Sequence, residues 1–198
     1  MFPDIARDDV FRLETRRLWL RWPRLSDAPA IERYCARWEV ACYTARIPHP
    51  YPKGSAERFV FASREANTLG RDLALVIALL GAPARVLGAI SLERRGTDRL
   101  ALGYALAPEA WGRGYATEAS LAIVDTAFAL SPVVEIEASV RIENPASGRV
   151  LEKIGFLRVR RGLRGAPARG AMVECDTYAL PRNTWTARRE AASLETAR

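Results

Sequence analysis

Hydrophobic and polar residues alternate in two stretches of the second half of the chain, and this alternation predicts two β-strands. In residues 99–107 the leucines and Tyr104 occupy every second position, and Pro108 ends the pattern. In residues 133–141 an apolar set alternates with a polar set: Val134, Ile136, Ala138 and Val140 against Glu135, Glu137 and Ser139. We therefore expect strands over 99–107 and 133–141.

The segment between these strands changes to a helical period. Residues 107–119 read A-P-E-A-W-G-R-G-Y-A-T-E-A, and Leu121, Val124 and Phe128 then follow the i, i+3, i+7 spacing of an amphipathic helix. Glycine allows backbone conformations that other residues avoid. The first N–H groups of a helix lack internal partners and lie at the positive end of the helix dipole. A strand, a glycine-rich turn and a helix N-terminus together predict a phosphate site.

Two other phosphate motifs fit this turn less well. The P-loop pattern G-x-x-x-x-G-K-S/T is excluded, because no Lys and Ser/Thr pair follows the glycines. The dinucleotide pattern G-x-G-x-x-G is incomplete, because Thr117 stands where the last small residue belongs. However, Glu135 and Glu137 lie about where a ribose-binding acid is expected. A dinucleotide site and a tight turn without a ligand both stay open at this point.

A second motif follows the second strand. Residues 144–156 read N-P-A-S-G-R-V-L-E-K-I-G-F. Asn144 suits the N-cap of a helix, Pro145 its first turn and Gly155 its C-terminal cap, so a short helix should end before a strand that starts at Phe156. The predicted order is strand, phosphate turn, helix, strand, short helix and strand.

Together, W-G-R-G-Y-A-T-E-A and residues 144–156 resemble the acetyl-CoA site of the GCN5-related N-acetyltransferases (the GNAT superfamily). More narrowly, they resemble the RimJ/RimL-like branch of ribosomal-protein N-terminal acetyltransferases. The superfamily pattern Q/R-x-x-G-x-G/A corresponds to residues 111–116, with Trp111 in place of Gln or Arg, a change that is common in this branch. Residues 15–21 resemble the opening strand of the family, so the resemblance covers residues 14–181.

This resemblance implies a mixed α/β GNAT fold, with a mostly antiparallel central sheet of about seven strands that is splayed between the fourth and fifth and flanked by helices. It implies a single acetyltransferase domain at residues 1–181 and a C-terminal tail at 182–198. Acetyl-CoA is the implied co-substrate, bound in the splay, and no metal is implied. The expected contacts with the pyrophosphate and the pantetheine arm are Leu106, Gly112, Arg113, Gly114, Tyr115, Ala116, Thr117 and Asn144.

The resemblance also implies direct attack of a neutral amine on the thioester, which needs a base and a proton donor for the departing thiolate. Many relatives have a tyrosine donor where this chain has Leu151, so we expect Ser147 of N-x-x-S to donate or orient the proton, or only to cap its helix. The branch often has a glutamate where this chain has Ala101. Glu93 is then the candidate base, and the alternatives are Asp98, Glu137 and a bound water.

The acceptor is expected to enter near residues 28–52. His49 is the only histidine and lies in the proline-rich segment 47–52, where we expect acceptor recognition or loop packing more than base catalysis. Trp38 and Tyr51 are expected to line the acceptor pocket. The acceptor is a primary amine, either a protein N-terminus or a small molecule. The alternative is an acyl-CoA-binding sensor that has lost catalysis.

Composition narrows the class of protein. With 198 residues, 49% of them hydrophobic, the chain can bury one substantial core. No apolar run approaches the ~20 residues that span a bilayer, and residues 1–20 lack the apolar segment of a signal peptide. We therefore expect a cytoplasmic protein with no membrane partner. Cys35, Cys42 and Cys175 lack metal-ligand spacing and are expected to be reduced thiols.

The net charge of +7 comes largely from residues 157–170, which hold five arginines and no acid. No aromatic residue alternates with these arginines, as a base-stacking surface requires, so we expect no specific nucleic-acid partner. The glycines and proline among them predict a mobile, solvated loop between the last two strands. Such a loop could attract an acidic cofactor or substrate. The chain could form a homodimer through a strand at 171–181, or remain a monomer.

Overall fold

One eight-stranded sheet runs through the computed structural model, which describes residues 1–196. The sheet has the order β1-β2-β3-β4-β5-β6-β8-β7, and every neighbouring pair is antiparallel except β5 and β6. The predicted mostly antiparallel fold is confirmed, and the short β1 brings the strands to eight. In chain order the strands are β1 Arg12–Glu14, β2 Leu18–Arg21, β3 Leu73–Leu79, β4 Ala82–Arg95, β5 Arg99–Leu106, β6 Glu135–Arg141, β7 Leu157–Ala166 and β8 Ala171–Pro181.

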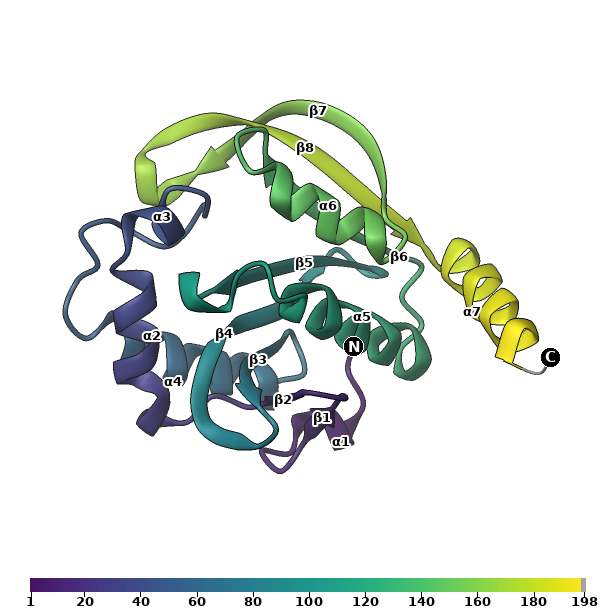
Figure 1. The fold of residues 1–198 in the computed structure, drawn as a ribbon, viewed down its shortest axis with the longest axis horizontal. Coiled ribbons are helices and arrows are strands. Elements are labelled where there is room, and N and C mark those ends of the chain that lie inside the picture. Colours follow the sequence, from purple (N-terminus) through teal and green to yellow (C-terminus); the bar gives the residue numbers. More distant parts are fainter. Residues whose placement is uncertain (197–198) are drawn as a thin grey trace.

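Helices cover both faces of this sheet (Figure 1). The larger core lies under α5 and α6, and a second, smaller core lies between the other face and α2 and α4. The α-helices are α1 Asp4–Arg7, α2 Ala28–Cys35, α3 Trp38–Ala41, α4 Ser55–Thr68, α5 Tyr115–Leu130, α6 Pro145–Lys153 and α7 Arg182–Thr196. The two cores position α5 and α6 on the same face of β5 and β6, where the phosphate turn is expected to act.

The sheet splays between β5 and β6. These strands pair in parallel over only three positions, Arg99 with Glu135, Leu100 with Ile136 and Ala101 with Glu137. Beyond them β5 continues along β4 alone, as far as Leu106 opposite Gly88. The predicted strands 99–107 and 133–141 are therefore the two sides of the opening.

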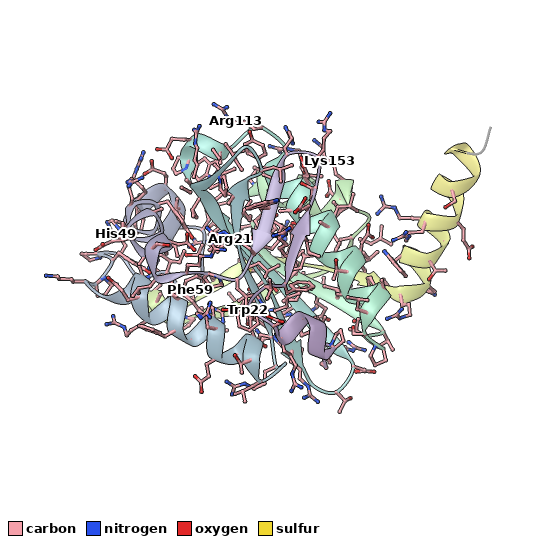
Figure 2. All side chains as sticks on the ribbon, turned by 90° about the horizontal axis from the view of Figure 1, so that it is seen from below. Arg21, Trp22, His49, Phe59, Arg113 and Lys153 are labelled. Atoms are coloured by element: carbon pink, nitrogen blue, oxygen red, sulfur yellow. The ribbon has the colours of Figure 1, made fainter. Side chains whose placement is uncertain are left out.

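A buried ion pair fastens β2 to the start of α2. The Arg21 guanidinium donates two hydrogen bonds of 2.8 Å to the two carboxylate oxygens of Asp27, and both side chains are buried. Asp27 also accepts from the backbone N–H of Arg24, at 2.7 Å. Figure 2 shows Arg21 in the interior of the molecule. The bidentate pair and this extra bond offset part of the cost of removing two charges from water, while the Arg21 Nε is buried without a partner.

The arginine-rich segment 157–170 is not the predicted loop. Most of it forms β7, an edge strand that pairs with β8 along its length. Its arginines contact the neighbouring strand at the surface: Arg158 and Arg161 pair with Asp176, and Arg164 donates to the Thr177 hydroxyl. The loop prediction was wrong because most of β7 is exposed, and its three large apolar residues, Leu157, Val159 and Leu163, are too few among the arginines and glycines to reveal its period in the sequence.

The C-terminal segment forms α7, which extends away from the sheet (Figure 1). Its first residue, Arg182, donates to the carbonyl oxygens of Phe128 in the last turn of α5 and of Ser131 and Val133 just beyond it. Trp185 stacks on Phe128 with ring centroids 5.1 Å apart. The helix is thus anchored at its start. The domain boundary at 181/182 stays a prediction.

Gly88 should be essential for the approach of β4 to β5. A Cβ atom at this position would lie 2.3 Å from the Ala105 carbonyl oxygen and 2.8 Å from the Leu106 Cα. We expect Gly88→Ala to lower the free energy of unfolding by about 2–3 kcal/mol, because the clash is with backbone that has to move. Gly81→Ala is the control, since its Cβ would meet nothing within 4 Å. Equal stability of the two variants in urea unfolding would contradict this account.

Candidate active site

The predicted phosphate turn has the geometry of an anion site. Gly112 and Gly114 adopt positive φ angles of 71° and 76°, and α5 begins directly after them. The Glu118 N–H donates to the Gly114 carbonyl as the first bond of the helix, so the amides of residues 115–117 precede the helical ladder. Figure 2 shows Arg113 at the outer edge of the molecule. The turn therefore presents backbone donors and a helix N-terminus to solvent at the end of β5.

One glutamate ties this turn to the start of β2. The Glu118 carboxylate accepts hydrogen bonds from the Thr15 hydroxyl at 2.6 Å, the Arg17 backbone N–H at 2.9 Å and the Arg17 Nε at 2.7 Å. Arg17 also donates to the Arg113 carbonyl at 3.0 Å and lies over the Tyr115 ring. Burial would raise the pKa of Glu118, but the hydrogen bonds from Thr15 and Arg17 hold it below its ordinary value. This charged network therefore ties the turn to the residues that precede β2.

Trp111, which replaces Gln or Arg in the motif, folds back onto β5. Its indole Nε1 donates to the Leu106 carbonyl at 2.9 Å, while much of its ring stays exposed. The carbonyl at the expected pantetheine edge therefore already has a partner. A carbonyl oxygen has two lone pairs, so a ligand N–H that uses this carbonyl has to share it with the indole.

The N-terminus of α6 faces the same opening. Asn144 caps the helix as predicted, and its side-chain oxygen accepts from the Ser147 N–H at 3.2 Å. The Ser147 hydroxyl lies 2.8 Å from the Tyr104 hydroxyl, which reaches across from β5. Burial raises the pKa of Tyr104 to about 12, although the Ser147 hydrogen bond acts in the opposite direction. In the sequence Tyr104 shows only as an alternating apolar position, so its role as partner of Ser147 was missed.

Two acidic residues flank the alanine at which the branch often has a glutamate. In the sheet register, Glu93 of β4 lies opposite Ala101 of β5, and Ala101 lies opposite Glu137 of β6. Glu93 forms ion pairs with Arg46 and Arg95. Glu137 lies 3.8 Å from Arg99 and 4.0 Å from Arg160. The two base candidates thus lie on either side of Ala101, and each forms ion pairs with two arginines.

The expected acceptor residues lie on a segment that crosses from one half of the sheet to the other. Trp38 and His49 contact each other edge to face, with ring centroids 5.2 Å apart, and Arg169 lies over the Trp38 ring. Arg141 of β6 donates to the Cys42 carbonyl at 2.7 Å, and Arg169 donates to the Ala41 carbonyl. The end of α3 is therefore fastened to β6 and to the turn between β7 and β8, beyond the splay. Tyr51 is half-buried against the α2–α4 core.

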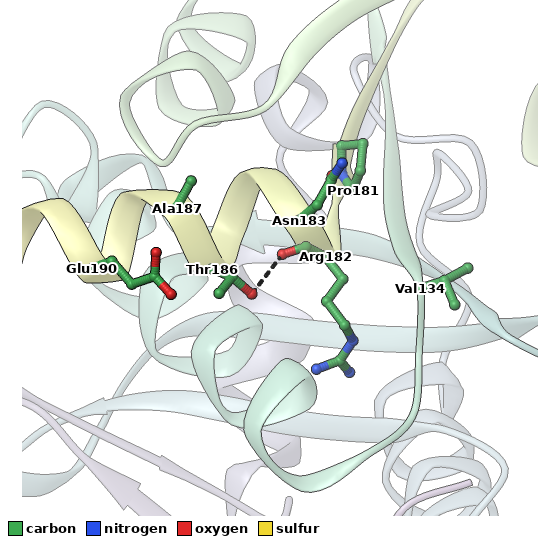
Figure 3. Close-up of a pocket in the computed structure, with 7 residues that line it drawn as sticks. All are labelled: Val134, Pro181, Arg182, Asn183, Thr186, Ala187 and Glu190. Carbon is green, nitrogen blue, oxygen red and sulfur yellow. Dashed lines mark hydrogen bonds between the residues drawn. The ribbon is translucent and has the colours of Figure 1, made fainter.

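The structure also has a surface cavity of about 590 Å³ where α7 leaves the sheet (Figure 3). It is lined by Val134, Pro181, Arg182, Asn183, Thr186, Ala187 and Glu190. None of the predicted site residues belongs to this lining. The cavity is therefore separate from the candidate site.

Comparison with known proteins identifies the family. The protein-family model described as acetyltransferase (GNAT) domain matches residues 17–157 of the chain. The chain belongs to the GNAT family. A curated relative, the uncharacterized N-acetyltransferase p20 of Bacillus licheniformis, is 26% identical in an alignment of 183 residues that covers 85% of this chain and 94% of the relative.

Solved acetyltransferase structures share the fold at lower identity. RimL, a ribosomal L7/L12 α-N-protein acetyltransferase in complex with CoA, matches with a TM-score of 0.75 and 15% identity, over 86% of this chain and 98% of RimL. Spermidine N-acetyltransferase from Vibrio cholerae, in complex with CoA and spermine, matches with a TM-score of 0.72 and 16% identity, over 87% and 99%. In the part of the GNAT chain that is described, no helix is long and apolar enough to cross a membrane.

Glu118 should stabilise the turn in a pH-dependent way. We expect Glu118→Gln to lower the free energy of unfolding by about 1–2 kcal/mol at pH 7, because charge-assisted hydrogen bonds are lost. Since the pKa of Glu118 is lowered on folding, its contribution is complete above about pH 4.3 and is lost as the pH falls through the lowered value. Urea unfolding at several pH values measures this difference.

The control for Glu118 is Glu109→Gln, which alters an exposed ion pair with Arg37 beside the same turn. Its effect should stay below about 0.5 kcal/mol at every pH. A difference between Glu118→Gln and wild type that persists unchanged at low pH would contradict the assignment.

Proposed function

We propose that this GNAT protein is an acetyl-CoA-dependent N-acetyltransferase of the RimJ/RimL-like branch, with a primary amine as acceptor. The observation that carries this proposal is the opening between β5 and β6, which has the phosphate turn at one end and the capped N-terminus of α6 on its side. The likeness in fold to RimL and to spermidine N-acetyltransferase, both in complex with CoA, supports it.

The turn supplies what a pyrophosphate needs. The backbone amides of residues 112–117 donate to the phosphate oxygens, and the dipole of α5 favours the negative charge. Positive φ at Gly112 and Gly114 keeps these amides clear of side chains. The Arg17–Glu118 network holds the turn in place before the ligand arrives, which reduces the ordering that binding requires.

The reaction is direct transfer. The lone pair of a neutral amine attacks the thioester carbon, the C–S bond breaks with its electron pair on sulfur, and the amine nitrogen loses a proton.

Glu93 is proposed as the base, directly or through a water, with Glu137 on the opposite side of Ala101 as the alternative. Trp38, His49 and Tyr51 are proposed to contact the acceptor. A cytoplasmic location stays a prediction.

Weakening the turn should weaken CoA binding. An alanine at Gly112 is strained at a φ of 71° and projects into open space where the phosphates are proposed to lie. We expect Gly112→Ala to raise the Kd for CoA about tenfold, or 1.4 kcal/mol. Gly96→Ala is the matched control, because Gly96 has a φ of 70°, equally open surroundings and a position in the distant β4–β5 turn. Calorimetry that finds equal Kd values for both variants would exclude this turn as the phosphate site.

Catalysis is tested by free-thiol release from acetyl-CoA with a panel of amines. The panel contains peptides with free N-termini, spermine and an amino acid, and each product is verified by mass spectrometry. We expect at least one acceptor to give turnover that depends on both substrates. Tight CoA binding without turnover on any amine would favour the second candidate function, a sensor, which the missing side chains at Ala101 and Leu151 suggest.

A further inference from the structure

The two hydroxyl groups that meet inside the opening come from different elements. Tyr104 lies on β5, three residues beyond the last β5–β6 pair at Ala101, and Ser147 lies in the first turn of α6. Their hydroxyl oxygens are 2.8 Å apart, and the Tyr104 hydroxyl lies 3.3 Å from the Ser147 carbonyl. This contact is part-buried and joins residues 43 positions apart in the chain. It is the hydroxyl pair that bridges the splayed strand and α6.

The pair lies on the path that the proposed function requires. A pantetheine arm that starts at the turn of residues 112–117 and enters the splay runs along β5 from Leu106 towards Ala101. Tyr104 is between these two residues, on the face of the sheet that α5 and α6 cover. The sulfur of the thioester therefore passes close to the hydroxyl pair.

We propose that Tyr104 donates the proton to the departing thiolate, and that Ser147 orients the Tyr104 hydroxyl. This inference rests on the proposed acetyl transfer. It places the phenol on β5, whereas relatives with a tyrosine donor have it at the position of Leu151 in α6. Leu151 is fully buried in the core here and has no donor.

The proton balance of the step is simple. When the C–S bond breaks, its electron pair goes to sulfur, and sulfur takes the proton from the Tyr104 hydroxyl. The nitrogen of the acceptor releases one proton to the base, and the Tyr104 oxygen is reprotonated from solvent. The products are the amide and the free thiol of CoA. A phenol whose pKa lies near 12 is protonated at neutral pH, so the donor is available at each turnover.

The acidity of Tyr104 and the anchoring of Ser147 decide which residue donates the proton and which one orients the donor. A phenol is more acidic than an aliphatic hydroxyl, so Tyr104 is the better donor of the two. Ser147 is held at its backbone by the Asn144 cap, with the Asn144 side-chain oxygen 3.2 Å from the Ser147 nitrogen. A fixed serine that contacts the phenol restricts the rotation of the Tyr104 hydroxyl. Ser147 is therefore a positioning residue in this proposal.

The test compares Tyr104→Phe, Ser147→Ala, the double variant and Tyr178→Phe. Tyr178 is the matched control, since its phenol belongs to β8, packs against Gly148 of α6 and contacts Glu152. We expect Tyr104→Phe to lower kcat about 100-fold with the best amine of the panel, with the Kd for CoA changed less than about threefold. Ser147→Ala should lower kcat less, and the double variant should resemble Tyr104→Phe alone.

A second readout needs no acceptor. The thiolate of bound CoA is titrated by its ultraviolet absorbance, with CoA itself as the probe. A hydrogen bond from Tyr104 stabilises the thiolate, so Tyr104→Phe should raise the pKa of the bound thiol by about one. Tyr178→Phe should leave it unchanged. A merely structural role for Tyr104 would alter the thermal stability or the Kd and leave this pKa where it is.

The outcomes separate the two proposals. If wild-type protein binds CoA but acetylates no amine, acetyl transfer fails, and the thiol pKa still decides whether Tyr104 faces the sulfur. If wild-type protein turns over and Tyr104→Phe keeps both its kcat and the thiol pKa, the role of Tyr104 is overturned and acetyl transfer stands. If wild-type protein does not bind CoA, both proposals fail.

Discussion

The candidate site depends on one constraint, the three-residue parallel pairing of β5 and β6. Parallel strands cannot be joined by a tight turn, so the chain has to cross over through a helix. The crossover here is the phosphate turn followed by α5. The N-terminus of α5 is therefore placed at the end of β5, next to the point where the strands separate. A longer pairing would close the opening, and an antiparallel pairing would remove the helix N-terminus from it.

Two hydrogen bonds give partners to polar groups beside the opening. The indole of Trp111 satisfies the Leu106 carbonyl at the end of β5, and the hydroxyl groups of Tyr104 and Ser147 satisfy each other. Unpaired polar groups in such a place would favour collapse of the strands onto one another. On the opposite side of β5, the close approach of Gly88 keeps the strand against β4.

Arginines connect the two halves of the molecule more than they mark a binding surface. Arg17 ties β2 to the phosphate turn, and Arg141 and Arg169 hold the carbonyl end of α3 against the strands beyond the splay. Arg158 and Arg161 share the carboxylate of Asp176. In these ion pairs the side chains of Arg158 and Arg161 stay 57% and 50% exposed. The basic segment is a strand of the sheet, and the contacts of Arg17, Arg141 and Arg169 hold the segments around the site in place.

The sequence by itself determined the local elements of this protein. Period-two alternation defined the strands on both sides of the opening, glycines before a helical period defined the turn that precedes α5, and Asn144 with Pro145 defined the start of α6, because each depends on neighbouring residues only. The tertiary structure decided which residues meet. The pair Tyr104 and Ser147, the register that sets Glu93 and Glu137 beside Ala101, and the strand at 157–166 all depend on sheet pairing between distant segments. Local spacing carries no information about that register, and an exposed edge strand with few apolar residues does not reveal its period.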